Sequence, residues 1–400
     1  MTVEREANEE PEAAAQRWAV PLSDLAVSDD IVEAVAKTIS SGWWTMGPTV
    51  ADFEEAFGAF CGAGHAIAVS SGTAALHLAL LACQCGPGDE VIMPSLNFVA
   101  AANAVSHTGA TPIFCDVQGP HDLNLDPADL EDAVTPHSKA ILVLHYGGFP
   151  CDMGAVMEIA SRHRLTVIED AAHAPGATWQ GRMCGTIGRA GCFSFFSNKN
   201  LPIGEGGMIV TDDPDLAERL RLLRSHGMTT LTWDRQRGHA HTYDVVASGF
   251  NYRLDEVRAA IGLVQLAELE AANNARARIT TRYRELLDGF EGIVIPFAEA
   301  DGTSSHHLAV AVLPEGAGRE RIQELMRRRR IQTSVHYPPI HRFSLYANTA
   351  GAGRSLPMTD SLAERVLTLP LYAHLQDAQV DTVSRALIEA LANERLSRPA

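Results

Sequence analysis

A single lysine, Lys199, stands between an apolar segment and a glycine-rich segment. Phe193, Phe195 and Phe196 precede it, and residues 204–207 follow it as Gly-Glu-Gly-Gly. The phenylalanines predict the end of a buried strand, which would place the Lys199 amine near the protein interior. Loss of hydration lowers the pKa of an ammonium group there, so that the amine can act as a nucleophile or a base. The alternative is an ordinary loop cation at a strand end.

A small-residue turn offers a place for a phosphate group. The apolar run 65–69 leads into Ser71, Gly72, Thr73 and Ala74, where a helix is expected to begin. Free NH groups at a helix N-terminus bind phosphate, and Gly72 lets the backbone come close to it. The alternative is a plain N-cap formed by Ser71 or Thr73. A P-loop is excluded, because the motif G-x-x-x-x-G-K-[ST] is absent.

Two further residues follow expected strands and complete a chemical set. Asp170 comes after the apolar run 165–168, and Phe98 follows the run 90–93. A carboxylate can hold a pyridine nitrogen in its protonated form, and an aromatic ring can stack on a flat cofactor. Alone, Asp170 could be a helix cap and Phe98 a core residue. Together with a phosphate cradle and Lys199 at one sheet edge, they predict pyridoxal 5'-phosphate (PLP) as the cofactor.

The elements that position these residues are expected to be parallel strands joined by helices. From about residue 51 to 262, short runs rich in Val, Ile and Phe alternate with helical patterns such as 73–83 and 154–163. The expected strands are 65–69, 90–93, 111–115, 140–145, 166–169, 190–196 and 208–211. Seven strands in one doubly wound α/β sheet would bind a ligand at their carboxyl ends.

The pattern changes after Asn251. Residues 255–284 predict one or two long helices that connect two domains. Beyond Phe290, strands are expected at 292–296, 307–313 and 332–336, and helices at 319–329, 360–366 and 377–392. The expected organisation is a disordered lead-in (1–20), a large PLP-binding domain (21–265) and a smaller α+β C-terminal domain (266–400).

Composition excludes several functional classes. The formal net charge of −17 repels polyanions and argues against nucleic acid, and no run is long and apolar enough to span a membrane. Seven cysteines without a C-x-x-C pair fit reduced thiols in a cytoplasmic protein. Neither His306 with His307 nor His336 with His341 shows a metal-ligand spacing, so no metal is expected.

Several ordered motifs over nearly the whole chain resemble the DegT/DnrJ/EryC1/StrS aminotransferase family. They are residues 40–48, 71–76, 87–92, 169–173, 193–207, 251–254 and 336–341. The resemblance implies a PLP-dependent transferase of fold type I, similar to aspartate aminotransferase. Its large sheet would be mixed but mostly parallel, and a homodimer would form active sites at the subunit interface. Asn97 departs from a common threonine, and Pro175 from a small residue or histidine.

The resemblance also implies roles for individual residues. Lys199 would be the Schiff base lysine and Asp170 the partner of the pyridine nitrogen. The other cofactor contacts would be Gly72, Thr73, Ala74 and Ser194 at the phosphate, Phe98 on the ring, His173 near the ring hydroxyl, and Asn251 at the neighbouring subunit's phosphate. Substrates would meet Trp43, Arg253, His336, Tyr337 and His341, for which packing between domains is the alternative.

The activity so implied is amino transfer from an amino acid, L-glutamate or L-glutamine, to a keto sugar. A nucleotide-linked deoxyhexose ketone in antibiotic or surface-glycan biosynthesis is expected, and an aminocyclitol precursor is the alternative. The related sugar dehydratases carry histidine where Lys199 stands, which favours transamination. A non-catalytic regulator of the same fold remains open, although Lys199 and Asp170 argue against it. A nicotinamide enzyme is rejected, because residues 351–356 lack the third glycine of the dinucleotide motif.

Overall fold

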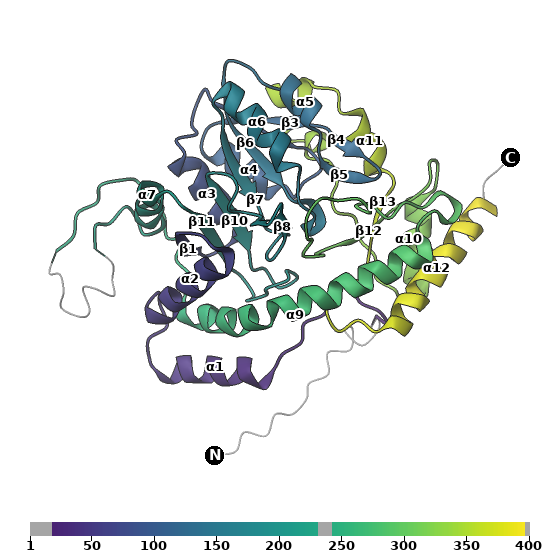
Figure 1. Cartoon of the computed structure of the whole chain (residues 1–400), viewed down its shortest axis with the longest axis horizontal. Helices are drawn as coiled ribbons and strands as arrows, with labels where there is room; N and C mark the ends of the chain where they lie inside the picture. The colour runs from purple at the N-terminus through teal and green to yellow at the C-terminus, as the bar shows by residue number, and fades with distance from the viewer. Residues whose placement is uncertain (1–17, 231–241, 397–400) are drawn as a thin grey trace.

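The computed structural model describes residues 18–230 and 242–396, which surround one central sheet (Figure 1). Its seven strands lie in the order β1-β11-β10-β7-β6-β2-β3. They are β1 (His65–Val69), β2 (Glu90–Pro94), β3 (Thr111–Cys115), β6 (Ser138–Leu144), β7 (Thr166–Asp170), β10 (Ala190–Ser194) and β11 (Gly207–Thr211). The ladders from β10 to β3 are parallel, whereas β11 is antiparallel to both neighbours. The mixed, mostly parallel sheet expected from the sequence is confirmed.

Helices cover both faces of this sheet, because each strand sends alternate side chains into two cores. The helices are α2 (Pro48–Cys61), α3 (Gly72–Ala82), α4 (Ala100–His107), α5 (Pro127–Asp132), α6 (Met153–His163) and α7 (Pro214–Arg224). On β1, Ile67 and Val69 face the core shared with α3, α4 and α7. Ala66 and Ala68 face the opposite core, which contains α2. A strand that is buried on both faces has a nearly continuous apolar sequence. These strands could therefore be predicted from the sequence.

One long helix, α9 (Glu256–Leu287), joins this sheet region to the C-terminal region. It spans about 48 Å at the α-helical rise per residue (Figure 1). Ala259 and Leu269 in its first part pack with α2, and Ile279 and Leu287 in its second part pack in the C-terminal core. The helix therefore continues through residue 265, and we propose that the boundary between the two expected domains lies within it.

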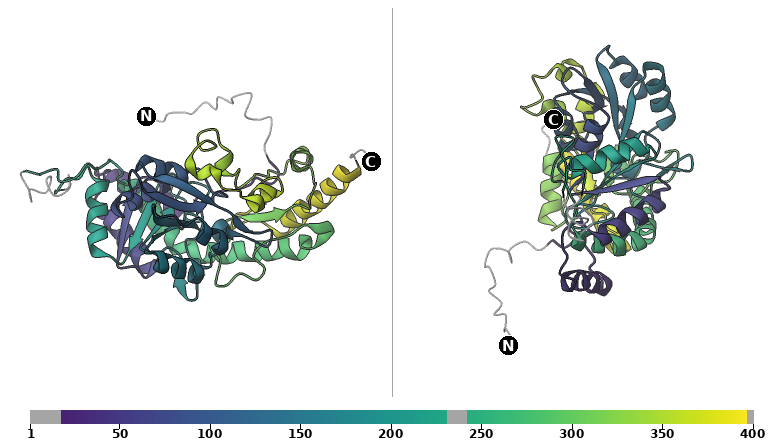
Figure 2. Two further views of the ribbon diagram at one scale, coloured as in Figure 1. Left: turned by 90° about the horizontal axis from the view of Figure 1, so that it is seen from above. Right: turned by 90° about the vertical axis from the view of Figure 1, so that its left-hand side faces the viewer.

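The C-terminal region has its own small sheet and helices. They are β12 (Ala309–Val312), β13 (Val366–Leu369), α10 (Arg319–Arg328), α11 (Pro357–Ala363) and α12 (Asp377–Leu396). β12 and β13 pair antiparallel, and α12 packs against α9 (Figure 2). The other described α-helix is α1 (Asp29–Ser40), and two hairpins are formed by β4 (Val117–Gly119) with β5 (Asp122–Leu125) and by β8 (Thr178–Trp179) with β9 (Arg182–Met183).

Three expectations for the C-terminal region were wrong in detail. The strands expected at 292–296 and 332–336 are reduced to single bridges, Val294 with Val312 and Ser334 with Thr368. The helix expected at 360–366 ends at Ala363, and β13 begins at Val366. β13 has four buried residues, of which three are apolar, and so short a run does not distinguish a strand from a helix by periodicity.

Of the lead-in 1–20, residues 1–17 lie outside the described residues, and Val20 forms a backbone bridge with Ile331. None of the described helices has the length and apolar character needed to cross a bilayer. Within the same residues, no three His, Cys, Asp or Glu side chains gather as a metal site would require. All seven cysteines are free and buried.

Candidate active site

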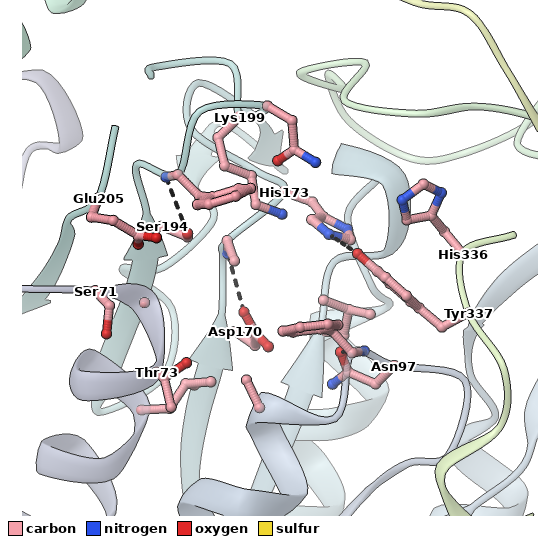
Figure 3. Close-up of a pocket in the computed structure, with 18 residues that line it drawn as sticks. Ser71, Thr73, Asn97, Asp170, His173, Ser194, Lys199, Glu205, His336 and Tyr337 are labelled. Atoms are coloured by element: carbon pink, nitrogen blue, oxygen red, sulfur yellow. Dashed lines mark hydrogen bonds between the residues drawn. The ribbon is translucent and has the colours of Figure 1, made fainter. Parts of the chain in front are cut away.

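The carboxyl ends of the parallel strands open into a cavity of about 380 Å³ (Figure 3). Its walls come from the β1–α3 turn, the ends of β6, β7 and β10, and the segments that follow β2 and β10. Nine of the residues expected in a site line it: Gly72, Thr73, Phe98, Asp170, His173, Ser194, Lys199, His336 and Tyr337. Parallel α/β sheets bind ligands at this edge.

Lys199 reaches this cavity from a tight turn after β10. Its backbone NH donates to Phe196 O at 2.8 Å, which closes the turn, and its side chain points toward His173 (Figure 3). Burial lowers the pKa of Lys199 to about 8, and the negative charge of Asp170 opposes this shift. About one tenth of the amine is therefore uncharged at pH 7, far more than for an ordinary lysine, and the uncharged form is the one that acts as a nucleophile or base.

Asp170 is a buried carboxyl group at the end of β7. It is 4% exposed and accepts a hydrogen bond from Ala172 N at 3.2 Å. Burial raises the pKa of Asp170, and no ion pair to it is found in the part of the chain that the structure describes. A buried carboxylate is costly unless a positive group accompanies it. A protonated pyridine nitrogen placed in the cavity would supply that charge, so the residue fits PLP.

The N-terminus of α3 forms the opposite end of the cavity. Ser71 caps the helix by accepting from Ala74 N at 3.1 Å, and Gly72 and Thr73 line the cavity. A Cβ on Gly72 would lie only 2.8 Å from Ser194 Cβ. Only glycine fits this approach between the helix start and β10. Backbone NH groups and the hydroxyls of Thr73 and Ser194 suit a phosphate group.

Replacing Gly72 with alanine is expected to weaken PLP binding at least about tenfold, because the new methyl group must displace Ser194 or the helix start. A PLP titration followed by absorbance measures this affinity. Gly353→Ala is the matched control, because a Cβ at Gly353 meets no atom within 4 Å. Equal PLP affinity of Gly72→Ala and the unaltered protein would contradict the predicted role.

His173 and Tyr337 form a hydrogen-bonded pair beside Lys199. Gly147 N donates to His173 Nδ1 at 3.2 Å, so the ring proton is on Nε2 and is donated to Tyr337 Oη at 2.8 Å (Figure 3). Burial holds the pKa of His173 well below its ordinary value. The ring of Phe98 is 56% exposed and lies 5.8 Å from the Tyr337 ring, between centroids. This wall therefore presents uncharged aromatic rings to a cofactor.

His336 is a third uncharged group at the site. Its Nδ1 lies 2.9 Å from Thr368 Oγ1, which fixes the ring to the C-terminal sheet. Burial, reinforced by the charge of Lys199, lowers the pKa of His336 to about 4. The imidazole is therefore neutral at physiological pH.

Five of the expected site residues lie outside the cavity lining of this chain: Trp43, Ala74, Asn251, Arg253 and His341. The NH of Ala74 is used by the Ser71 cap. Asn251 is exposed and bridges Ser225 through its backbone. His341 lies between Ser95 Oγ, at 2.7 Å from Nδ1, and Asp360 Oδ1, at 3.1 Å from Nε2. The roles of these residues remain predictions.

The sequence analysis assigned no role to Asn97 or Glu205, which line the cavity, or to His307, which contacts Lys199. Asn198, considered from the sequence as a hydrogen-bonding residue beside Lys199, also lines the cavity. Asn97 directly precedes Phe98, and Glu205 lies within the motif 193–207, so their places in the sequence were the available signal. His307 lies 108 residues from Lys199 in sequence, and no spacing rule connects them.

Comparisons with known proteins agree with this geometry. A model of the DegT/DnrJ/EryC1/StrS aminotransferase family matches residues 26–388. The spore coat polysaccharide biosynthesis protein SpsC of Bacillus subtilis is 42% identical over 374 residues, which cover 92% of this chain and 96% of SpsC.

Two solved structures add information on ligands. The putative sugar aminotransferase Spr1654 of Streptococcus pneumoniae in its PLP form is 27% identical, with a TM-score of 0.86 over 94% of this chain and 99% of Spr1654. DesI, solved in the presence of its TDP-sugar product, is 31% identical, with a TM-score of 0.85 over 96% of this chain and 95% of DesI. The chain therefore belongs to the DegT/DnrJ/EryC1/StrS aminotransferase family, and it is a PLP-dependent aminotransferase of fold type I.

Proposed function

We propose that this aminotransferase moves an amino group from L-glutamate or L-glutamine to the keto group of a nucleotide-linked deoxyhexose. The observation that carries the proposal is the placement of Lys199 and Asp170 on opposite sides of one cavity at the carboxyl ends of the strands. DesI, a relative over nearly the whole chain, was solved with a TDP-sugar product, which supports the class of acceptor.

The residues that line the cavity fit PLP, and each part of the cofactor would contact a different set of them. Gly72, Thr73 and Ser194 would hold the phosphate, and Phe98 would lie against the ring. Asp170 would keep a proton on the ring nitrogen, because the positive charge formed there compensates its buried carboxylate. When bound, PLP supplies an electron sink for the electrons of a broken Cα–H bond.

Lys199 is the group that moves protons in this proposal. Its uncharged Nζ would accept the proton from the donor's α-carbon and would give it up again as the amino group is transferred. Burial keeps the imidazoles of His173, His307 and His336 neutral, and all three lie close enough to Lys199 for its charge to lower their pKa further.

The donor half-reaction is expected to become faster as the pH rises through about 8. Folding lowers the pKa of Lys199 to about 8, so the ammonium form, which cannot accept a proton, dominates below that pH and the amine above it. Stopped-flow absorbance of the cofactor with glutamate, recorded from pH 6 to 9, measures the rate. A rate independent of pH across this range would contradict the role of Lys199 as base.

The proposed reaction can be tested directly. The purified protein is loaded with PLP and given glutamate or glutamine, and the released 2-oxo acid is measured. The aminated protein is then given TDP-4-keto-6-deoxyhexoses, and mass spectrometry detects an amino sugar. Amination of scyllo-inosose instead would favour the cyclitol alternative. Loss of a sugar hydroxyl would indicate a dehydratase, and absence of any turnover would indicate a regulator.

We further propose that a second copy of the chain completes each active site. Asn251 is exposed and lies outside its own cavity lining, and large apolar side chains stand exposed nearby in sequence, including Val245 and Val246 at 55% and 57%. Phe98 and Phe196 at the cavity are also exposed. Light scattering of the purified protein measures its mass in solution, and a monomer would contradict this arrangement.

The state of the cysteines supports a cytoplasmic location. All seven are free and buried, and burial raises the pKa of Cys61, Cys83 and Cys85, which makes those thiols unreactive. A core that contains several free thiols suits a reducing compartment. We propose that the protein works there, and fractionation of cells that produce it would test the location.

A further inference from the structure

A buried histidine to which the sequence assigned no role contacts the amine of Lys199. His307 Nε2 lies 3.4 Å from Lys199 Nζ, and His307 is 7% exposed. Its ring also lies against His173, with 4.5 Å between the ring centroids. The other ring nitrogen, Nδ1, lies 3.0 Å from Asn200 Oδ1. The direction of these hydrogen bonds decides what His307 does to the amine.

Two backbone carbonyls settle that direction. Pro175 O accepts from Asn273 Nδ2 at 2.9 Å, so Asn273 Oδ1 faces Asn200 and accepts from its Nδ2 at 2.8 Å. Ser305 O also accepts from Asn200 Nδ2, at 2.7 Å. Because a carbonyl oxygen can only accept, both amides are oriented, and Asn200 Oδ1 accepts from His307 Nδ1. The ring proton of neutral His307 is therefore on Nδ1, and Nε2 presents a lone pair to Lys199.

The His307 imidazole stays neutral in this position. Burial, reinforced by the positive charge of Lys199, holds the pKa of His307 well below its ordinary value. A neutral acceptor takes one hydrogen from Nζ and leaves the lone pair of Nζ free to accept a proton. The opposite tautomer would donate to that lone pair and block it. A proton that Nζ has accepted stays on Nζ and does not pass to His307, because the pKa of Lys199 is much higher than that of His307.

We propose that His307 is a positioning residue for Lys199, which holds Nζ by accepting a hydrogen bond from it whenever the lysine is not bonded to the cofactor. The proposal rests on the proposed role of Lys199 as base. No proton passes to His307: Nζ takes the proton up and delivers it. The other titratable groups that face the amine or His307 are Asp170, His173 with its partner Tyr337, His336 and Arg276.

The test measures the titration of Nζ in the cofactor-free protein. The chain has three lysines, Lys37, Lys139 and Lys199, so carbamoylation by cyanate can be followed at each of them by mass spectrometry as the pH changes. Lys37, exposed on α1, is the internal reference. His307→Leu is expected to lower the midpoint for Lys199 by about one pH unit, because an acceptor of the ammonium form is lost.

Two variants separate this role from a general structural one. His307→Gln keeps a side-chain oxygen that can accept from Nζ, and it is expected to restore most of the midpoint. His306→Gln is the matched control, because His306 is the adjacent residue and its ring packs against Phe149 instead of Lys199. It should leave the midpoint unchanged. In the PLP-loaded protein, His307→Leu should slow the half-reaction with glutamate at least about tenfold, with glutamate affinity retained.

An unchanged Lys199 midpoint in His307→Leu would overturn the proposal, as would a His307→Gln variant that behaves like His307→Leu. If His307→Leu does not fold, Asn200→Leu gives the same test, because it removes the acceptor that fixes the tautomer. Its Lys199 midpoint should also fall, and an unchanged midpoint would overturn the proposal. Since carbamoylation requires neither cofactor nor sugar, a failed sugar assay would be a separate result.

Discussion

Replacing Lys199 with alanine is expected to reduce amino transfer at least about 10⁴-fold and to remove the visible absorbance of lysine-linked PLP. Lys199 is the only lysine among the residues that line the cavity, and its amine is proposed both to bond the cofactor and to move the proton. Both functions are lost together, which is why the effect should exceed that of a single lost hydrogen bond. The rate is measured as 2-oxo acid released from glutamate.

The control for this substitution is Lys139→Ala, which removes another of the three lysines at the start of β6. It should keep both the absorbance band and the activity. Circular dichroism should show the same secondary structure in Lys199→Ala as in the unaltered protein. A Lys199→Ala protein that keeps the band would place the cofactor-bonding amine elsewhere.

Replacing Asp170 with asparagine is expected to slow the half-reaction with glutamate by about 10² to 10³-fold. The two side chains have nearly the same shape, so the change removes charge with little change in packing. An amide cannot compensate the positive charge of a protonated ring nitrogen, and the cofactor then accepts electrons less well. Stopped-flow absorbance measures the rate with saturating glutamate.

Asp52→Asn is the matched control, because Asp52 is exposed on α2 and the substitution makes the same chemical change. Its rate should equal that of the unaltered protein. The Asp170→Asn protein should still bind PLP, since the phosphate contacts and Lys199 remain. A half-reaction as fast as that of Asp52→Asn would show that the buried carboxylate does not act on the ring.

The sheet could be predicted from the sequence because its strands are buried on both faces. In β11, all five residues from Gly207 to Thr211 are buried, and no polar residue interrupts the run. Elements with mixed burial were harder to locate. Gln332 and Ser334 are polar residues in a segment that was expected to be a strand, and only Ser334 forms a bridge. Local pattern cannot show whether a partner strand is present.

The residues of the candidate site also differ in whether the sequence could predict them. Lys199, Asp170 and Gly72 each follow or precede a recognisable strand, and parallel strands bring their carboxyl ends to one edge. His307 does not belong to such a motif. It meets Lys199 only because the C-terminal region folds back onto the sheet, and that contact depends on the tertiary structure. Asn273 on α9 is similarly distant in sequence from Asn200, to which it is hydrogen-bonded.

The Ser95–His341–Asp360 hydrogen bonds have a consequence for how the cavity receives its ligands. Ser95 belongs to the same loop as Phe98, and His341 belongs to the same segment as Tyr337. His341 N also donates to Ser95 Oγ, at 3.2 Å. These bonds hold the loop of Phe98 and the segment of Tyr337 together on one wall of the cavity without help from a ligand. The cavity is thus preorganised, and little of the binding free energy of an incoming cofactor is spent on ordering its walls.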